Sequence, residues 1–263
     1  MITPFNNLQA TEISTELQKV YFVEPKHMNQ LITNNAMFIS GERGSGKTTI
    51  LRHLEKLFNQ NPAHEYLGVY FRFETAYMRS LYNQDISEEK NIRGFSQIIT
   101  AIWSKLICET LLRIKEENAI SYQKEQELCE SVLKLFFNYD ERWEKTLKSL
   151  RDIFEKTRME LMFGIINGDV PLCFSYAELL DHFALKLREE EIYSRTCVCI
   201  LLDEYENLTY TQQRVINSFV KNHSYYLTYK ICMRPEGFRT QLTLAEHEQL
   251  MPFHDYKLVQ YIQ

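Results

Sequence analysis

Residues Gly41 to Thr48 carry the clearest chemical pattern in this chain, because their sequence Gly-Glu-Arg-Gly-Ser-Gly-Lys-Thr fits G-x-x-x-x-G-K-[ST]. The three glycines let the backbone curl so that successive N–H groups point inward at phosphates. Lys47 is placed to reach the β- and γ-phosphates, and the Thr48 hydroxyl is placed to coordinate magnesium. The segment therefore predicts a loop that holds the phosphates of ATP together with Mg²⁺.

The elements around this loop are those that such a loop requires. Residues Ala36–Ser40 predict a short buried strand before it, and residues Thr48–Phe58 predict a helix after it, whose positive N-terminal end favours anions. A glycine-rich turn without a ligand is the alternative, and these flanking elements disfavour it. The residues that we expect to bind the nucleotide are Gly41, Glu42, Arg43, Gly44, Ser45, Gly46, Lys47, Thr48 and Thr49.

An acidic pair, Asp203-Glu204, follows the continuous apolar run Cys197–Leu202. Such a run is typical of a central parallel strand that is buried on both faces. We expect Asp203 to hold magnesium together with Thr48, and Glu204 to orient or deprotonate the attacking water. A pair of carboxylates that only caps a turn is the alternative. The second carboxylate favours hydrolysis over binding alone.

Arg234 follows the next predicted strand, Thr228–Met233. Ligands of parallel α/β sheets bind at the carboxyl ends of the strands, so a guanidinium there is placed to sense the γ-phosphate and stabilise charge in transfer. A surface arginine at a strand end is the alternative. The predicted catalytic residues are therefore Glu204, Lys47 and Arg234.

The elements that must position these residues form an α/β fold. Five strands separated by helices predict a three-layer sandwich with a mostly parallel five-stranded sheet. The predicted strands are Ala36–Ser40, Leu67–Phe73, Cys197–Leu202, Thr228–Met233 and Tyr256–Ile262. The other predicted helices are Phe95–Ile114, Tyr122–Phe137, Trp143–Phe163, Ser175–Arg188 and Thr209–Asn222. Ser175 is the predicted N-cap of its helix, because Glu178 follows it by three residues as in a capping box.

Most of these helices fall between the second and third strands. We therefore predict a nucleotide-binding core formed by residues 1–80 and 191–263, interrupted by a large helical insertion at residues 81–190. The insertion is a surface that could recognise a partner or a trigger. No internal repeat or low-complexity tract is present.

Composition also limits the classes of function and location that the chain can belong to. The net charge of -5 does not support a protein whose whole surface binds nucleic acid, although a local basic strip remains compatible with it. The six cysteines include no CxxC pair, and we interpret them as small buried side chains in a reduced compartment rather than as a Cys-x-Cys metal or redox site. No apolar run reaches about 18 residues and no signal pattern opens the chain, which predicts a cytoplasmic protein without a membrane span.

Other nucleotide-binding classes lack their markers, since no N-K-x-D or L-S-G-G-Q-type motif is present and no lid or acceptor motif of a simple kinase is evident. The chain instead resembles AAA+/STAND-type ATPases, and most closely the bacterial Orc/Cdc6-like group. The segments that carry the resemblance are Tyr21–Pro25, Gly41–Thr48, Leu201–Leu208 and Ile231–Gly237. The resemblance covers about residues 20–80 and 195–262.

The resemblance implies a five-stranded sheet with the strand before the loop near its middle, Glu204 as catalytic carboxylate and Arg234 as sensor. It also implies an oligomer with nucleotide between subunits, or a partner effector protein, and a possible role in bacterial anti-phage defence. Relatives usually continue past the fifth strand into a helical lid with a further arginine, so this chain would need oligomerisation or a lid supplied from elsewhere for full hydrolysis.

Two alternatives remain open. The chain could be a regulatory module that binds ATP as an assembly signal without hydrolysing it. It could also be an Orc/Cdc6-like DNA-binding ATPase, although the scattered basic residues Arg151, Lys156 and Arg158 fit a solvated helix face better.

Overall fold

The computed structural model describes residues 28–61, 65–115, 122–189 and 193–260. Its centre is a five-stranded sheet in the order β2-β3-β4-β1-β5, and every pair of neighbouring strands is parallel. The strands are β1 (Met37–Ser40), β2 (Tyr66–Arg72), β3 (Cys197–Asp203), β4 (Leu227–Met233) and β5 (Lys257–Gln260). The predicted α/β fold with a five-stranded parallel sheet is confirmed.

The strands match the predicted ones to within one or two residues at each end. All seven residues of β3 and all seven of β4 are buried, as their apolar sequences indicate. The strand before the glycine-rich loop, β1, lies beside the edge strand β5, whereas β4 occupies the middle of the sheet. The end of the predicted strand Tyr256–Ile262 and the segment Tyr21–Pro25 lie outside the described residues.

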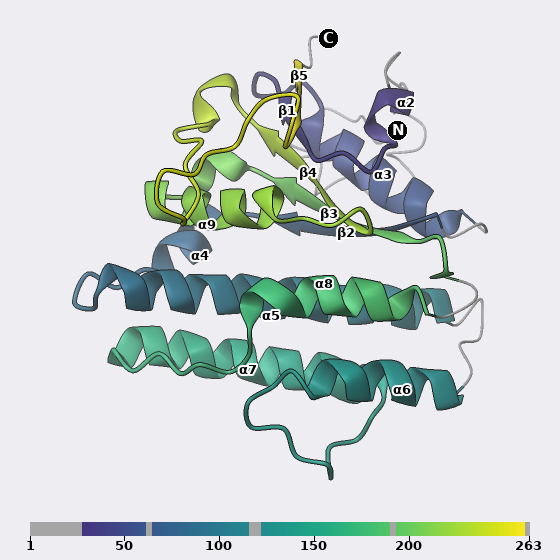
Figure 1. The fold of residues 1–263 in the computed structure, drawn as a ribbon. Helices are drawn as coiled ribbons and strands as arrows, with labels where there is room; N and C mark the ends of the chain where they lie inside the picture. Colours follow the sequence, from purple (N-terminus) through teal and green to yellow (C-terminus); the bar gives the residue numbers. More distant parts are fainter. Residues whose placement is uncertain (1–27, 62–64, 116–121, 190–192, 261–263) are drawn as a thin grey trace, which may run out of the picture.

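One face of the sheet is covered by α3 (Lys47–Gln60) and the short α2 (Met28–Leu31) (Figure 1). The apolar side of α3 packs on the sheet through Ile50, Leu51, Leu54 and Phe58, which lie at helical spacing and are buried. This packing fixes the start of α3, and therefore the glycine-rich loop, against the ends of the strands.

The opposite face is covered by helices that lie between β2 and β3 in the sequence, together with α9 (Tyr210–Lys221) (Figure 1). The helices α5 and α8 form the layer next to the sheet, and α7 and α6 lie further out against them. The bounds are α4 (Thr75–Ser80), α5 (Glu88–Lys115), α6 (Tyr122–Leu133), α7 (Leu147–Asn167) and α8 (Tyr176–Leu187). One buried cluster joins these helices to the sheet, so the helical region shares its core.

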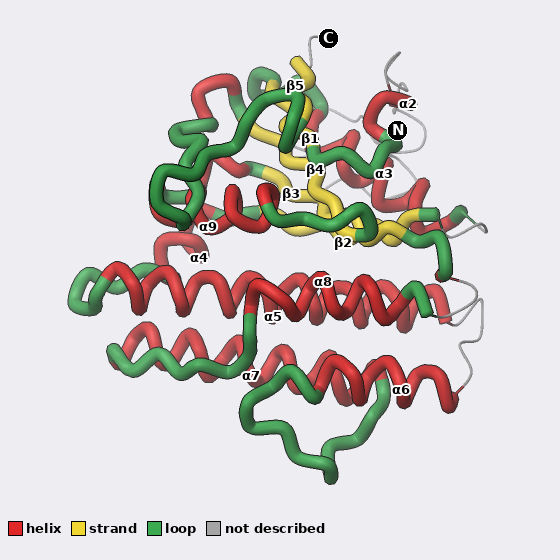
Figure 2. The backbone as a smooth tube through the Cα atoms, viewed as in Figure 1, coloured by secondary structure: helices red, strands yellow, loops and turns green. Residues whose placement is uncertain are grey.

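Helix ends depart from the predicted ones where local contacts intervene. The helix predicted to reach Phe137 ends at Leu133, because Phe136 bridges to Phe174 and the long connection to α7 begins there (Figure 2). The start of α7 is set by Thr146, whose hydroxyl accepts from the backbone N–H of Ser149.

The capping predictions had a mixed outcome. Ser175 is the N-cap of α8 as predicted, but its side chain makes no capping hydrogen bond there. Instead, a complete capping box forms at the start of α9 between Thr209 and Gln212, where it had not been predicted. This box fixes the entry of α9 directly after the acidic end of β3.

The longest helix, α5, has an apolar stretch that could span a membrane by length and composition. Among the described residues it is the one helix of this kind, spanning Glu88–Ile114, and 78% of its apolar window is buried inside the protein. The absence of such a stretch had been expected from the sequence. Its burial against the sheet and α7 is that of a core helix, and one helix of this kind is weak evidence for a membrane.

Candidate functional site

The glycine-rich loop connects β1 to α3 in a conformation that depends on glycine. Gly44 and Gly46 have φ angles of 83° and 89°, a left-handed region that other residues rarely adopt. Gly46 is the N-cap of α3, so Lys47 and Thr48 open the helix and the free N–H groups of its first turn face the loop. The backbone N–H of Gly41 donates to Met233 O at the end of β4 over 3.2 Å.

The Lys47 side chain folds back over this loop. Its ammonium donates to the backbone carbonyls of Gly41, at 2.5 Å, and Glu42, at 2.8 Å. The hydroxyl of Ser45, a buried residue in the same loop, has no hydrogen-bond partner. The Lys47 ammonium, the unpaired Ser45 hydroxyl and a helix N-terminus in one loop fit a phosphate chain, which would accept hydrogen bonds from all three.

The two residues predicted to hold magnesium lie together. The Thr48 hydroxyl donates to Oδ2 of Asp203 over 2.6 Å, although the two residues come from different elements. Oδ1 of the same carboxylate accepts from the Glu204 backbone N–H at 3.0 Å, and the residue is only 2% exposed. A hydroxyl and a buried carboxylate side by side are the hard oxygen ligands that Mg²⁺ prefers, so the residues present fit this ion.

A further donor to Asp203 was not found from the sequence. The Tyr70 hydroxyl of β2 donates to Oδ2 over 3.0 Å. Burial and the neighbouring Asp203 charge raise the pKa of Tyr70, so the phenol stays protonated and keeps donating. The guanidinium of Arg52 lies over the Tyr70 ring, 3.5 Å from its centroid, which holds the ring in place.

Glu204 has a left-handed backbone, with φ 59° and ψ 43°, at the point where β3 turns into the short 3-10 helix η4 (Tyr205–Asn207). Its two carboxylate oxygens each have a partner. The guanidinium of Arg72 lies 2.8 Å from Oε1, and the Asn207 amide donates to Oε2 over 3.0 Å. The hydrogen bond to Glu204 raises the pKa of Arg72. A water molecule would therefore have to compete with these two partners for the carboxylate.

Arg234 lies at the end of β4 as predicted, at the N-cap of the 3-10 helix η5 (Pro235–Gly237). Its Nε is 3.1 Å from Oε1 of Glu206, and its side chain is 51% exposed. The arginine therefore reaches the correct edge of the sheet but is paired with a carboxylate of η4. The remaining loop residues Glu42 and Arg43 are exposed.

The structure thus gathers Lys47, Thr48, Asp203 and Glu204 at the carboxyl edge of the sheet and leaves Arg234 beside them in an ion pair. The residues that sequence reasoning missed are Tyr70, Arg72, Asn207 and Glu206. The one sequence signal for Arg72 is a charged residue near the end of a predicted strand; its position opposite Asp203 is known only from the register of β2 and β3.

The cysteines offer no metal or redox group to this site, although the Cys232 thiol donates to the Lys47 carbonyl over 3.8 Å. Cys197, Cys199 and Cys232 are free and buried, and burial raises the pKa of each thiol. In the described part of the chain, no group of His, Cys, Asp and Glu side chains is placed to hold a metal ion by itself. The magnesium that we expect would therefore depend on Thr48, Asp203 and the phosphates.

Comparison with known protein families decides which family of nucleotide-binding proteins the chain belongs to. The ORC-CDC6-like family description matches residues 3–262, almost the whole chain. The chain belongs to the ORC-CDC6-like family. This membership makes it an AAA+ P-loop protein of the ATP-binding kind, as the sequence motifs had indicated. A search of curated proteins found no match.

The extent of the match adds to what the motifs suggested. The resemblance noted from the sequence covered the two nucleotide-binding segments, whereas the family match also includes helices α4 to α8. The helical region of this ORC-CDC6-like protein is thus inside the matched domain. Domain boundaries at residues 80 and 190 stay a prediction.

Proposed function

We propose that this ORC-CDC6-like protein is a magnesium-dependent ATPase whose hydrolysis is controlled through Glu204. The observation that carries the proposal is the 2.6 Å contact between Thr48 and Asp203, because it joins the glycine-rich loop to the acidic strand end where the phosphates and their metal would lie. Family membership supports the binding of ATP.

The residues take the following roles. The N–H groups of the loop and the Lys47 ammonium bind the β- and γ-phosphates, which would draw Lys47 away from the carbonyls of Gly41 and Glu42. Thr48 and Asp203 would hold Mg²⁺, which when bound neutralises charge on the phosphate oxygens. Glu204 orients the attacking water and accepts its proton once Arg72 or Asn207 releases the carboxylate.

Arg234 is proposed to stabilise the charge of the γ-phosphate after leaving Glu206. Its exposure at the strand edge also suits contact with nucleotide bound by a neighbouring subunit, as in an oligomeric switch or motor. The alternative is a module that binds ATP and never hydrolyses it, in which case the Arg72–Glu204 pair is a permanent structural contact.

ATP binding and turnover with Mg²⁺, measured over a range of protein concentrations, test the proposal. We expect Lys47→Ala to lose ATP binding, and Glu204→Gln to retain binding while losing turnover by about 10²-fold or more, as for removal of a general base. Turnover that rises with protein concentration would indicate sites shared between subunits. Binding without turnover at any concentration would support the non-hydrolysing module, and no binding by the wild-type chain would refute the proposal.

A further inference from the structure

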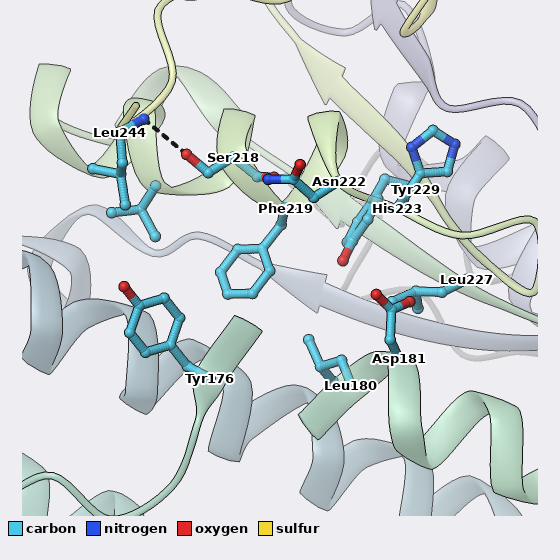
Figure 3. Close-up of a pocket in the computed structure, with 11 residues that line it drawn as sticks. Tyr176, Leu180, Asp181, Ser218, Phe219, Asn222, His223, Leu227, Tyr229 and Leu244 are labelled. Carbon is cyan, nitrogen blue, oxygen red and sulfur yellow. Dashed lines mark hydrogen bonds between the residues drawn. The ribbon is translucent and has the colours of Figure 1, made fainter. Parts of the chain in front are cut away.

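A cavity lies between α8, α9 and β4, on the face of the sheet opposite the α3 helix that carries Lys47 (Figure 3). The cavity itself has a volume of about 60 Å³, and it opens into a wider space of about 430 Å³ that includes solvent. Its walls are mainly apolar and aromatic, and they are supplied by Leu180 of α8, Val215 and Phe219 of α9, and Leu244. This mainly apolar lining with a few polar groups is that of a small-molecule pocket.

A buried phenol points into this cavity. Tyr229 of β4 is 0% exposed, and its hydroxyl has no hydrogen-bond partner within the protein. In Figure 3 the hydroxyl is directed at the space between Phe219 and Asp181. Buried polar groups are nearly always paired, so an unpaired hydroxyl aimed into a cavity indicates a partner that enters from outside.

A carboxylate lies next to this phenol. Asp181 of α8 accepts a hydrogen bond from the Ser224 hydroxyl over 2.8 Å. Asp181 and Tyr229 line the same cavity (Figure 3), and after burial the Asp181 charge raises the pKa of Tyr229. Among the described residues that line the cavity, Asp181 is the one carboxylate, His223 is the one basic side chain, and none is a lysine or an arginine. Neither Asp181 nor Tyr229 takes part in the nucleotide site.

We propose that this cavity binds a small organic amine, with its ammonium between Asp181 and the Tyr229 oxygen and its apolar part against Phe219 and Leu180. The ammonium donates to the carboxylate and to the phenol oxygen, and the phenol hydroxyl can in turn donate to the carboxylate. Anions such as carboxylates and phosphates are disfavoured, because they would meet the Asp181 carboxylate. The aromatic walls suit a group about the size of one ring.

This site goes beyond the proposed ATPase and does not depend on it. Its wall is nevertheless connected to the acidic strand end, because Asn217 of α9 accepts from the Tyr205 hydroxyl over 2.7 Å and Tyr205 directly follows Glu204. A ligand that orders α9 would thus act on an element joined to the turn at Glu204.

The test uses three ring-sized probes, benzylamine, benzyl alcohol and benzoate, with the full chain in solution. Binding is followed by calorimetry and by the methyl resonances of Leu180 and Leu244. We expect saturable binding of benzylamine at millimolar concentrations, weaker binding of benzyl alcohol, and no binding of benzoate.

Variants decide where and how the amine binds. Asp181→Asn should weaken benzylamine at least tenfold and leave benzyl alcohol nearly unchanged, whereas Asp169→Asn, at an exposed aspartate outside the cavity, should change neither. Leu244→Trp, at a half-buried wall position, should block all binding by filling the space. Circular dichroism and thermal unfolding show that each variant is folded.

Some results would overturn the proposal. The amine site is wrong if wild type shows no saturable binding of benzylamine, or if benzoate binds as tightly as benzylamine. It is also wrong if Asp181→Asn binds benzylamine as tightly as wild type, or if a folded Leu244→Trp still binds it. ATP binding measured on the same samples is expected to persist in all variants, which separates failure here from failure of the nucleotide site.

Discussion

The hydroxyl of Tyr70 donates a 3.0 Å hydrogen bond to the same oxygen of Asp203 that accepts from Thr48. The carboxylate predicted to hold magnesium is thus positioned by a neighbouring strand as well as by the glycine-rich loop. Because Tyr70 lies on β2, which pairs with β3 along its whole length, this contact is built into the sheet itself.

Tyr70→Phe should loosen this carboxylate without unfolding the protein. A hydrogen bond to a charged group contributes about 1.5–3 kcal/mol to stability. Because Asp203 keeps two other donors, we expect the free energy of unfolding in urea to fall by the lower end of that range. The magnesium concentration that supports half-maximal ATP turnover should rise. Tyr82→Phe, at an exposed tyrosine, is the matched control. Unchanged stability and magnesium dependence in Tyr70→Phe would show that the contact does not position Asp203.

Arg72→Ala should release Glu204 from its guanidinium partner. If the ion pair with Arg72 restrains Glu204 as the general base, basal ATP turnover should rise several-fold in the variant. This rise is small beside the roughly 10²–10⁴-fold that a positioned general base contributes to a reaction rate. Steady-state phosphate release measures the effect, with Arg79→Ala on the exposed side of α4 as control. A fall in turnover with retained ATP binding would instead mean that Arg72 positions Glu204 for catalysis.

The Arg234→Ala variant tests whether Arg234 senses the γ-phosphate or is only a surface arginine. The ion pair with Glu206 is half exposed on the arginine side, so its loss should cost no more than about 1 kcal/mol of stability. Turnover should nevertheless fall by about 10²-fold if the guanidinium stabilises charge in transfer. Glu206→Gln, which removes the competing partner, should leave turnover equal or higher. Wild-type turnover in Arg234→Ala would identify the arginine as structural.

Glu155 provides a pH-dependent link between α7 and α5. Its hydrogen bonds to Arg158, at 2.6 Å, and to Lys105, at 3.2 Å, lower its pKa to about 2. A depressed carboxyl pKa stabilises the folded state above the unfolded value of 4.5, and this contribution is lost as the pH falls from there toward about 2. After discounting for solvent screening, we expect Glu155→Gln to cost about 1 kcal/mol at pH 7.

Urea unfolding of wild type and Glu155→Gln between pH 7 and pH 3 checks this prediction. The difference between the two proteins should shrink steadily below pH 4.5. Glu160→Gln, at an exposed position of the same helix, should show a smaller difference at every pH. A difference that stays constant over this range would mean that Glu155 acts through packing rather than charge.

The strands and the glycine-rich loop could be predicted because their signals are local. An unbroken apolar run such as Cys197–Leu202 requires burial on both faces, and the loop requires glycine at the left-handed positions Gly44 and Gly46. Their chemistry follows from residue types at fixed spacing. The same reasoning placed Asp203 and Thr48 at one edge of the sheet, because parallel strands share their carboxyl ends.

The contacts that control Glu204 could not be predicted in this way. They depend on the register between β2 and β3, which sets Arg72 opposite Asp203, and on the left-handed turn that sends the Glu204 side chain back toward β2. Likewise, the pattern of α5 shows an apolar helix but not that its partner is the sheet. Long-range pairing is decided by packing, and one sequence carries no direct record of it.

The chain leaves the sheet for the helical region immediately after the residue that holds Glu204. From Arg72 it passes through Phe73, whose carbonyl accepts from Asn207, into α4 at Thr75, and the Gln212 amide of α9 donates to the carbonyl of Met78 there. The backbone connection between the sheet and the helical region therefore begins at the ion-pair partner of Glu204. The helical region and the carboxylate that is proposed to accept a proton share this one short segment of chain.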